Sequence, residues 1–97
     1  MFFHLGENHY IDAKEILMII DIKSAMSSKI TRDFIEKAKS SGNSVMLSSG
    51  KPKSIIVARK KTSKGYLVKA YYSSISSTTL LKRSYQYDFS SFEMEVI

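Results

Sequence analysis

The sequence predicts an α+β fold: a small single domain that is rich in β-strand. The chain has 97 residues, of which 43% are hydrophobic, and this is enough for one compact core. Most of its apolar segments are short runs bounded by turn residues, which is typical of strands. One segment alone, between Ser28 and Gly42, has the 3.6-residue spacing of a convincing amphipathic helix.

The N-terminal part of the chain is predicted to form three strands. Residues 2–5 and 10–12 are joined by turn residues 6–8 and make a hairpin. Residues 15–22 are hydrophobic on both faces of the pleat except at Asp21, which indicates a central strand covered on both sides. A short helix is the alternative here, but consecutive large apolar residues form no amphipathic stripe.

The main helix is predicted to begin after Ser27 or Ser28, either of which can serve as its N-cap. Gly42, followed by Asn43, is expected to end it. Lys37 and Lys39 fall in its last turns, where they favour the helix dipole. The predicted apolar face of this helix consists of Ile30, Phe34, Ile35 and Ala38.

Three further strands are predicted at residues 44–47, 54–60 and 66–72. Residues 48–53 are expected to form a hairpin between the first two, and residues 62–65 a hairpin between the last two. After a polar link, residues 78–83 are expected to form a short helix capped by Ser76 or Ser77.

The chain is predicted to divide into a domain at residues 1–84 and an acidic, aromatic C-terminal tail at residues 85–97. This tail is expected either to add a last strand to the sheet or to become ordered on a neighbouring subunit.

Charge is unevenly distributed along the chain. Residues 37–87 carry eleven bases and no acid, whereas residues 1–36 carry four bases against six acids and residues 88–97 carry three acids. Such segregation predicts a surface of positive potential, for which nucleic acid is the commonest partner of a small protein. The alternative is a solvated lysine-rich face that only aids solubility.

The basic residues form three groups. Lys51 and Lys53 lie on a turn stiffened by Pro52, which loses little entropy when it docks on phosphates. The strand that follows places this turn roughly 20 Å from a second basic group at its other end. One duplex could not easily contact both ends of the strand, so only one of the two is expected to face nucleic acid. The second and third groups are Arg59, Lys60, Lys61 and Lys64, and then Lys82 and Arg83.

Enzyme constellations are weak, and neither a catalytic site nor a small-molecule substrate is predicted. The chain has no cysteine, no G-x-S-x-G elbow and no phosphate-cradling glycine loop. His4 and His9 lack the carboxylate spacing that would support a metal site, so no metal or other cofactor is expected.

The N-terminus has no signal-peptide pattern, and no apolar run approaches the ~20 residues that span a bilayer. We therefore expect a cytoplasmic protein without a membrane partner. Three tyrosines could stack on unpaired bases, although tyrosine is also a common strand residue; they are Tyr66, Tyr71 and Tyr72.

Three segments of the sequence, residues 4–6, 50–57 and 76–83, resemble the RemA/RemB family of extracellular matrix regulatory proteins, and within it the RemB branch. The resemblance implies a LytTR-like fold, with strands in two hairpins, one main helix and a short C-terminal helix. It also implies a DNA-binding transcriptional regulator of biofilm-matrix genes that assembles into rings, with DNA along the outside.

The resemblance carries over residue by residue only in part. Lys51 stands where the RemA branch has the first arginine of its DNA-contacting loop, and Lys53 stands near a later one. Arg83 matches a basic residue near that branch's C-terminus. Pro52 replaces a second loop arginine, and Glu15, preceded by Lys14, replaces another. Since lysine cannot make the bidentate contact of arginine to guanine, the expected contacts are mainly to phosphates.

The leading hypothesis is a cytoplasmic regulator that binds double-stranded DNA as a ring or other homo-oligomer. One alternative is an oligomeric scaffold whose basic face meets an acidic partner protein, and another is an RNA-binding protein that uses its tyrosines. The predicted nucleic-acid-binding residues are Lys51, Lys53, Lys82, Arg83, Arg59, Lys60 and Lys14.

Overall fold

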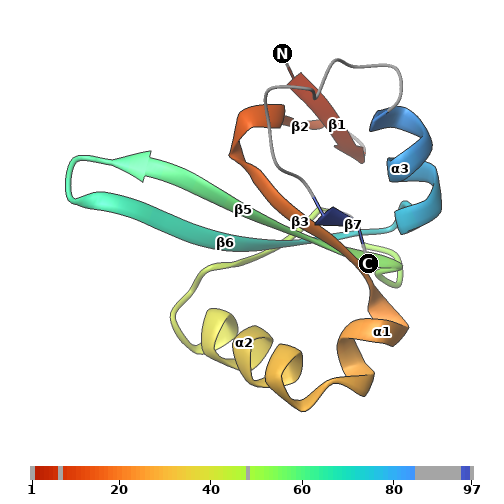
Figure 1. The fold of residues 1–97 in the computed structure, drawn as a ribbon, viewed down its shortest axis with the longest axis horizontal. Helices are drawn as coiled ribbons and strands as arrows, with labels where there is room; N and C mark the ends of the chain where they lie inside the picture. The colour runs from red at the N-terminus through yellow and green to blue at the C-terminus, as the bar shows by residue number, and fades with distance from the viewer. Residues whose placement is uncertain (1, 7, 48, 85–94, 97) are drawn as a thin grey trace.

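The computed structural model describes residues 2–6, 8–47, 49–84 and 95–96. It confirms the predicted α+β class, a small single domain of strands and helices (Figure 1). The elements follow in the order β1 (Phe2–Gly6), β2 (His9–Asp12), a 3-10 turn (Ala13–Glu15), β3 (Ile16–Asp21), α1 (Ile22–Ser27), α2 (Lys29–Ser40), β4 (Ser44–Met46), β5 (Ser54–Thr62), β6 (Gly65–Ser73), α3 (Ser77–Ser84) and β7 (Glu95–Val96).

The strands form two sheets. β1 and β2 pair as an antiparallel hairpin, as predicted, and the larger sheet has the order β4-β6-β5-β3-β7. β5 is antiparallel to both of its neighbours, β3 and β6, whereas β4 and β7 join the edges in parallel. The predicted central position of the strand at residues 15–22 is confirmed, because β3 lies between β5 and β7.

The hairpin predicted at residues 48–53 is wrong. β4 pairs in parallel with β6, with Val45 opposite Tyr71, and does not pair with β5. The physical reason is that β3 and β6 already occupy both edges of β5. Leu47, directly after β4, is buried, and its N–H extends the pairing with β6 by donating to the Tyr72 carbonyl at 3.0 Å.

Both faces of the large sheet are covered, by α1 and α2 on one side and by the β1–β2 hairpin with α3 on the other (Figure 1). Alternate residues of β5 enter the two resulting clusters. The buried residues on the hairpin side are Phe3, Leu5, Ile11, Ile16, Ile19, Leu47, Ile56, Ala58 and Leu80. Those on the helical side are Ile20, Ala25, Ile35, Ala38, Ile55, Val57, Ala70 and Tyr72.

The helix α1 is absent from the prediction. Its N-cap is Asp21, whose Oδ2 accepts from the backbone N–H groups of Lys23 at 3.0 Å and Ser24 at 3.2 Å. The sequence pattern assigned this acid to the end of a strand. The same carboxylate both ends β3 and begins α1, since an aspartate there satisfies two free N–H groups of the first turn.

The main helix, α2, begins as predicted, with Ser28 as its N-cap, and ends before Gly42, whose φ is +74°. Its predicted apolar face is half wrong, because Ile35 and Ala38 are buried but Ile30 is 84% exposed and Phe34 is 36% exposed. α2 packs mainly over β4 and β6, so its first turns leave a gap over β3 and β5. An apolar hollow remains there, lined by Met18, Ile20, Ile30, Thr31, Phe34 and Val57.

The predicted hairpin at residues 62–65 is confirmed and is longer than expected. β5 and β6 remain paired out to Thr62 and Gly65, so residues 63–64 alone form the turn. Gly65 has a φ of +123°, a backbone conformation in which any residue with an L side chain would be strained. The hairpin projects well beyond the body of the domain (Figure 1).

The short helix predicted at residues 78–83 is confirmed as α3, and the Ser76 Oγ accepts from the N–H of Thr79 at 3.2 Å at its start. At the C-terminus β7 pairs with β3, with Glu95 opposite Met18. The other tail residues, 85–94 and 97, lie outside the described residues. Within the described ranges, no helix is long and apolar enough to cross a membrane.

The buried Ser73 hydroxyl joins the two sheets, and its loss is expected to destabilise the fold. Its Oγ donates to the Leu5 carbonyl of β1 and accepts from the Ile75 N–H at 3.0 Å. Ser73→Ala leaves both of these groups without their partner. The free energy of unfolding should therefore fall by about 1–3 kcal/mol, measured by urea denaturation.

Tyr72→Phe is the matched control, because it removes a buried hydroxyl that has no hydrogen-bond partner among the described residues. Its loss should be neutral or slightly stabilising. A Tyr72→Phe variant that loses as much stability as Ser73→Ala would contradict this account of the two hydroxyl groups.

Candidate nucleic-acid interface

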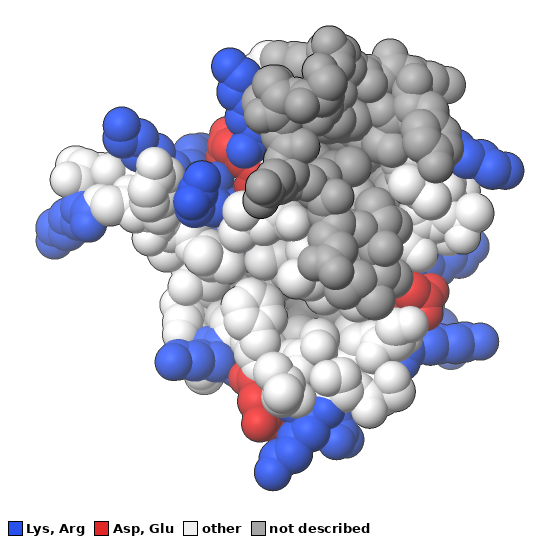
Figure 2. All heavy atoms as spheres, in the orientation of Figure 1, with Lys and Arg blue, Asp and Glu red and all other residues white. Residues whose placement is uncertain are grey.

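The predicted binding residues do not form one patch. Figure 2 shows lysine and arginine side chains spread around the rim of the molecule, several of them on the projecting hairpin, with few acids between. The basic loop is residues 49–53, and the basic arm is residues 59–66. Lys51 and Lys53 belong to the loop, Arg59 and Lys60 to the arm, and Lys82 with Arg83 to the end of α3.

The backbone of the basic loop is fastened at Lys53. Its N–H donates to the Ser73 carbonyl at 2.8 Å, and its carbonyl accepts from the Ile22 N–H at 3.0 Å. Pro52 is half-buried, whereas the side chains of Lys51 and Lys53 are exposed. The Lys53 ammonium group is therefore presented from a backbone held to both β6 and α1, which lowers the entropy lost on docking, and Lys51 lies two residues before it.

The tertiary structure also brings other charges to the loop. The Ile22–Lys53 bond places the first turn of α1 beside it, and Lys23 in that turn is exposed. Lys23 is thus a candidate contact that the sequence pattern missed, because its position beside the loop depends on the tertiary bond between Ile22 and Lys53. Asp21 lies opposite Ser54 in the sheet, so the segment that is acid-free in sequence has an acid nearby in space.

The basic arm lies at the other end of β5. All of its residues are exposed, including Arg59, Lys60, Lys61 and Lys64. The guanidinium Cζ of Arg59 lies 4.3 Å from the centre of the Tyr66 ring, within the range of a cation–π interaction. The ring itself is 61% exposed.

Lys14 lies at the base of the arm and not beside the loop. It belongs to the 3-10 turn that leads into β3, and Ile16 at the start of β3 is paired with Ala58, the residue before the arm. Its backbone N–H donates to the Asp12 side chain at 3.1 Å, while its own side chain is exposed. Lys14 and the two loop lysines therefore lie in different regions of the domain.

Arg83 makes a structural contact. Its Nη1 donates to the His4 carbonyl at 3.1 Å and lies 3.3 Å from the His4 Nδ1. The His4 ring in turn packs on Tyr10, with ring centres 4.8 Å apart. Arg83 thus ties the end of α3 to β1, and the neighbouring Lys82 is the exposed cation of this group.

The three tyrosines differ in exposure. Tyr72 is buried in the helical-side cluster, and Tyr71 is half-buried against the other cluster. Burial and, second, the nearby charge of Glu15 raise the pKa of the Tyr71 phenol above its ordinary value of 10.0. Tyr66 is therefore the tyrosine of the three whose ring is most open to a base.

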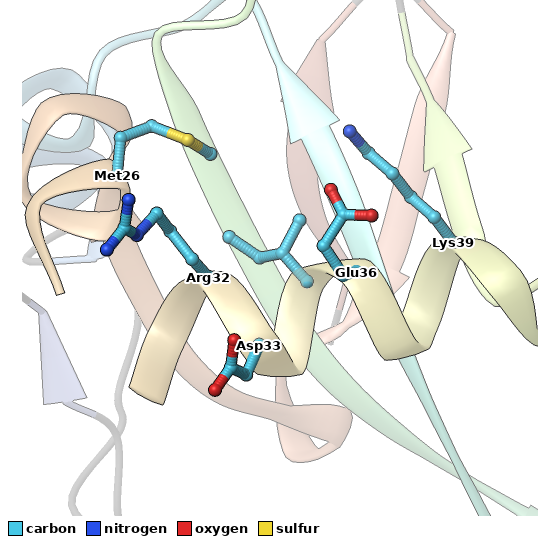
Figure 3. Close-up of a pocket in the computed structure, with 6 residues that line it drawn as sticks. Met26, Arg32, Asp33, Glu36 and Lys39 are labelled. Carbon is cyan, nitrogen blue, oxygen red and sulfur yellow. The ribbon is translucent and has the colours of Figure 1, made fainter. Parts of the chain in front are cut away.

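The surface of α2 is less suited to a polyanion. Figure 3 shows acids and bases of this helix around one hollow, with Asp33 and Glu36 next to Arg32 and Lys39. Mixed charges of this kind largely cancel beyond a Debye length of about 8–10 Å. The loop and the arm are thus the stronger candidates for contact with phosphates.

The described residues thus form a small α+β domain with two exposed lysines on a loop that is hydrogen-bonded to the sheet and to α1, and with a basic projecting hairpin. The family model described as Extracellular matrix regulatory protein A-like (RemA-like) matches residues 2–83, so the chain belongs to this family. Among the curated proteins, the Extracellular matrix regulatory protein B of Bacillus subtilis (strain 168) is 36% identical over 85 residues, which is 87% of this chain and 90% of that protein. The resemblance to the RemB branch is confirmed. No solved structure matches the chain.

Tyr71 is expected to control part of the alkaline stability of the protein. Because its pKa is raised in the folded state, that state holds the phenol proton more tightly than the unfolded chain does. The stabilisation is present below the unfolded pKa of about 10 and is lost as the pH rises through the folded pKa. Tyr71→Phe should therefore flatten the fall in unfolding free energy between about pH 9 and pH 11.

The same urea titrations on Tyr66→Phe provide the control, since the Tyr66 ring is mostly exposed. Glu15→Gln should let Tyr71 ionise at a lower pH than in the wild type, which the tyrosinate absorbance would detect. If the unfolding free energies of the wild type and Tyr71→Phe fall equally between about pH 9 and pH 11, the pKa of Tyr71 is not raised by folding and this prediction is wrong.

Proposed function

We propose that this member of the RemA-like family is a cytoplasmic, DNA-binding transcriptional regulator of extracellular matrix genes. It acts as a homo-oligomer, in ring form or another closed form, whose subunits contact DNA phosphates through the basic loop. The regulatory role follows from the family, and the fastened geometry of the loop is the observation that supports DNA as the ligand.

The loop suits phosphate better than base recognition. Lys51 and Lys53 each provide a compact charge that can neutralise a phosphate and release counterions. Pro52 between them provides no side-chain donor, and the loop contains no arginine for a bidentate contact to guanine. The basic loop therefore provides affinity and register, whereas sequence preference must come from other contacts or from DNA shape.

A single subunit offers too few loop contacts for firm binding. Two lysines release on the order of two counterions, which gives weak, strongly salt-dependent affinity. Repetition of the same loop around an oligomer makes the later contacts intramolecular and raises avidity by roughly 10²–10⁴. Self-association is thus a requirement of this mechanism.

Charge reversal of the loop is expected to weaken DNA binding. Lys51→Glu with Lys53→Glu should lower affinity for duplex DNA by more than ~10-fold at low salt. It should also make the plot of log affinity against log salt shallower by ~2 for each subunit on the DNA. Fluorescence anisotropy with random genomic duplexes at two salt concentrations would measure both effects.

The matched control is Lys29→Glu with Arg32→Glu, which makes the same charge change at exposed positions of α2. A loop variant with unchanged affinity would remove the loop from the mechanism. If the wild type binds no DNA at low salt but binds an acidic protein, the scaffold function that the charge pattern also allows would replace the proposal.

The mass in solution tests the oligomer. Light scattering on the full-length chain should give a multiple of the 11.0 kDa subunit. A second measurement on a chain ending at Ser84 would show whether the C-terminal segment, including β7, supports assembly. A lone subunit at micromolar concentration, with DNA binding intact, would contradict the avidity mechanism.

A further inference from the structure

We propose that the basic arm is a β-ribbon that enters the major groove of duplex DNA, as a contact separate from the basic loop. The proposal rests on the DNA-binding function above, but it needs no contribution from Lys51 or Lys53. Its basis is the length of the arm, the distribution of its charges over both faces and the fixed position of Arg59.

The arm is long enough to enter the groove. The last buried residue of β5 before it is Ala58, which is 2% exposed and pairs with Lys69. From there β5 continues through Thr62, paired with β6 throughout. At about 3.4 Å a residue, four paired residues extend roughly 14 Å, compared with about 8.5 Å for the depth of the major groove.

The arm is also of a suitable width. The major groove, about 12 Å wide, admits a two-stranded β-ribbon, whereas the minor groove is only about 6 Å wide. The turn at its tip, residues 63–64, is small and polar. The arm can therefore enter the groove tip first.

Cations occupy both faces of the ribbon. Successive side chains of a strand point to opposite faces, so Arg59 and Lys61 lie on the side of Val57, whereas Lys60 lies on the side of Ala58. Lys64 is in the turn. A groove has one phosphate strand on each wall, and a ribbon inserted between them would place a cation against both.

The arm contributes little to the core of its own domain. None of its residues is buried, and residues 59–68 include no acid that could pair with these bases internally. Four cations on a narrow projection repel one another, which is unfavourable unless an anion neutralises them. A surface that served solubility alone would not need to concentrate them on a ribbon paired to its tip.

Arg59 is positioned before any ligand binds. Its guanidinium lies over the Tyr66 ring, 4.3 Å from the ring centre, on the neighbouring strand. Because a ring that holds the guanidinium in place reduces the rotamer entropy lost on binding, Arg59 is suited to the phosphates at the mouth of the groove. Lys64, at the tip, is the arm cation closest to the base edges.

The arm and the loop lie at opposite ends of β5, roughly 20 Å apart, so their contributions are separable. The test uses full-length protein and compares three sets of substitutions by fluorescence anisotropy on a random duplex. The arm variant is Lys60→Gln, Lys61→Gln and Lys64→Gln; the loop variant is Lys51→Gln and Lys53→Gln; the control on α2 is Lys29→Gln, Arg32→Gln and Lys37→Gln.

The arm variant should lose affinity at low salt and show a slope of log affinity against log salt that is shallower by ~2.7 for each arm on the DNA. Between about 50 and 200 mM salt, the affinity of the arm variant should therefore fall by a factor that is ~40-fold smaller than the factor for the wild type. The control should match the wild type. Methyl green, which occupies the major groove, should displace the arm-dependent part of the binding, whereas netropsin in the minor groove should not.

Tyr66→Ala tests the positioning of Arg59, because it removes the ring while keeping every charge. It should weaken binding by a smaller factor than the arm variant and leave the salt slope unchanged. Rescue by Tyr66→Phe, which keeps the ring, would confirm that the ring face acts on Arg59.

The outcomes separate this proposal from the proposed function. If the loop variant loses affinity but the arm variant behaves as the control does, the arm proposal is overturned and the DNA-binding function stands. If the arm variant alone loses affinity, the arm proposal stands and the role of the loop falls. Displacement by netropsin, or preference for single-stranded RNA, overturns the assignment to the major groove. A wild type that binds no duplex overturns both.

Discussion

Burial of β5 on both of its faces is the constraint on which the rest of the structure depends. Ile55 and Val57 pack beneath α1 and α2, whereas Ile56 and Ala58 pack against the β1–β2 hairpin and α3. A strand covered in this way must have hydrogen-bonded neighbours at both edges, because an unpaired backbone group inside the core is costly. β3 and β6 provide them, and β4 is consequently displaced to the outer edge of β6.

The two basic regions follow from the limits of that buried segment. At one end, the buried part of β5 begins with Ser54, whose Oγ donates to the Ile75 carbonyl at 2.7 Å. The adjacent basic loop is hydrogen-bonded to β6 and α1 through Lys53. At the other end, β5 is no longer buried after Ala58, although β5 and β6 remain paired. One region is thus a short loop that is held to the framework at Lys53 and the other a projecting ribbon, and the same strand separates them.

Much of the fold could be predicted from local patterns, because the signals were local. Ser28 as a cap, the turn at Gly42 and the hairpin at residues 62–65 depend on residues close in sequence. The errors concern relations between distant segments: the partner of β4, the exposure of Ile30 and the second role of Asp21 as a helix cap. None of these follows from periodicity, because each depends on which edge or face another element already occupies.

The sequence by itself determined the α+β class, the membership of the matrix regulatory family and the excess of bases between residues 37 and 87. The order of residues and their local patterns are enough for these, since none of them requires knowing which distant segments pack together. Only the tertiary structure decided which bases act together. It separated Lys14 from Lys51, placed Lys23 beside the loop and engaged Arg83 with His4. Electrostatic interactions depend on distance in space, and strand pairing sets that distance independently of separation along the chain.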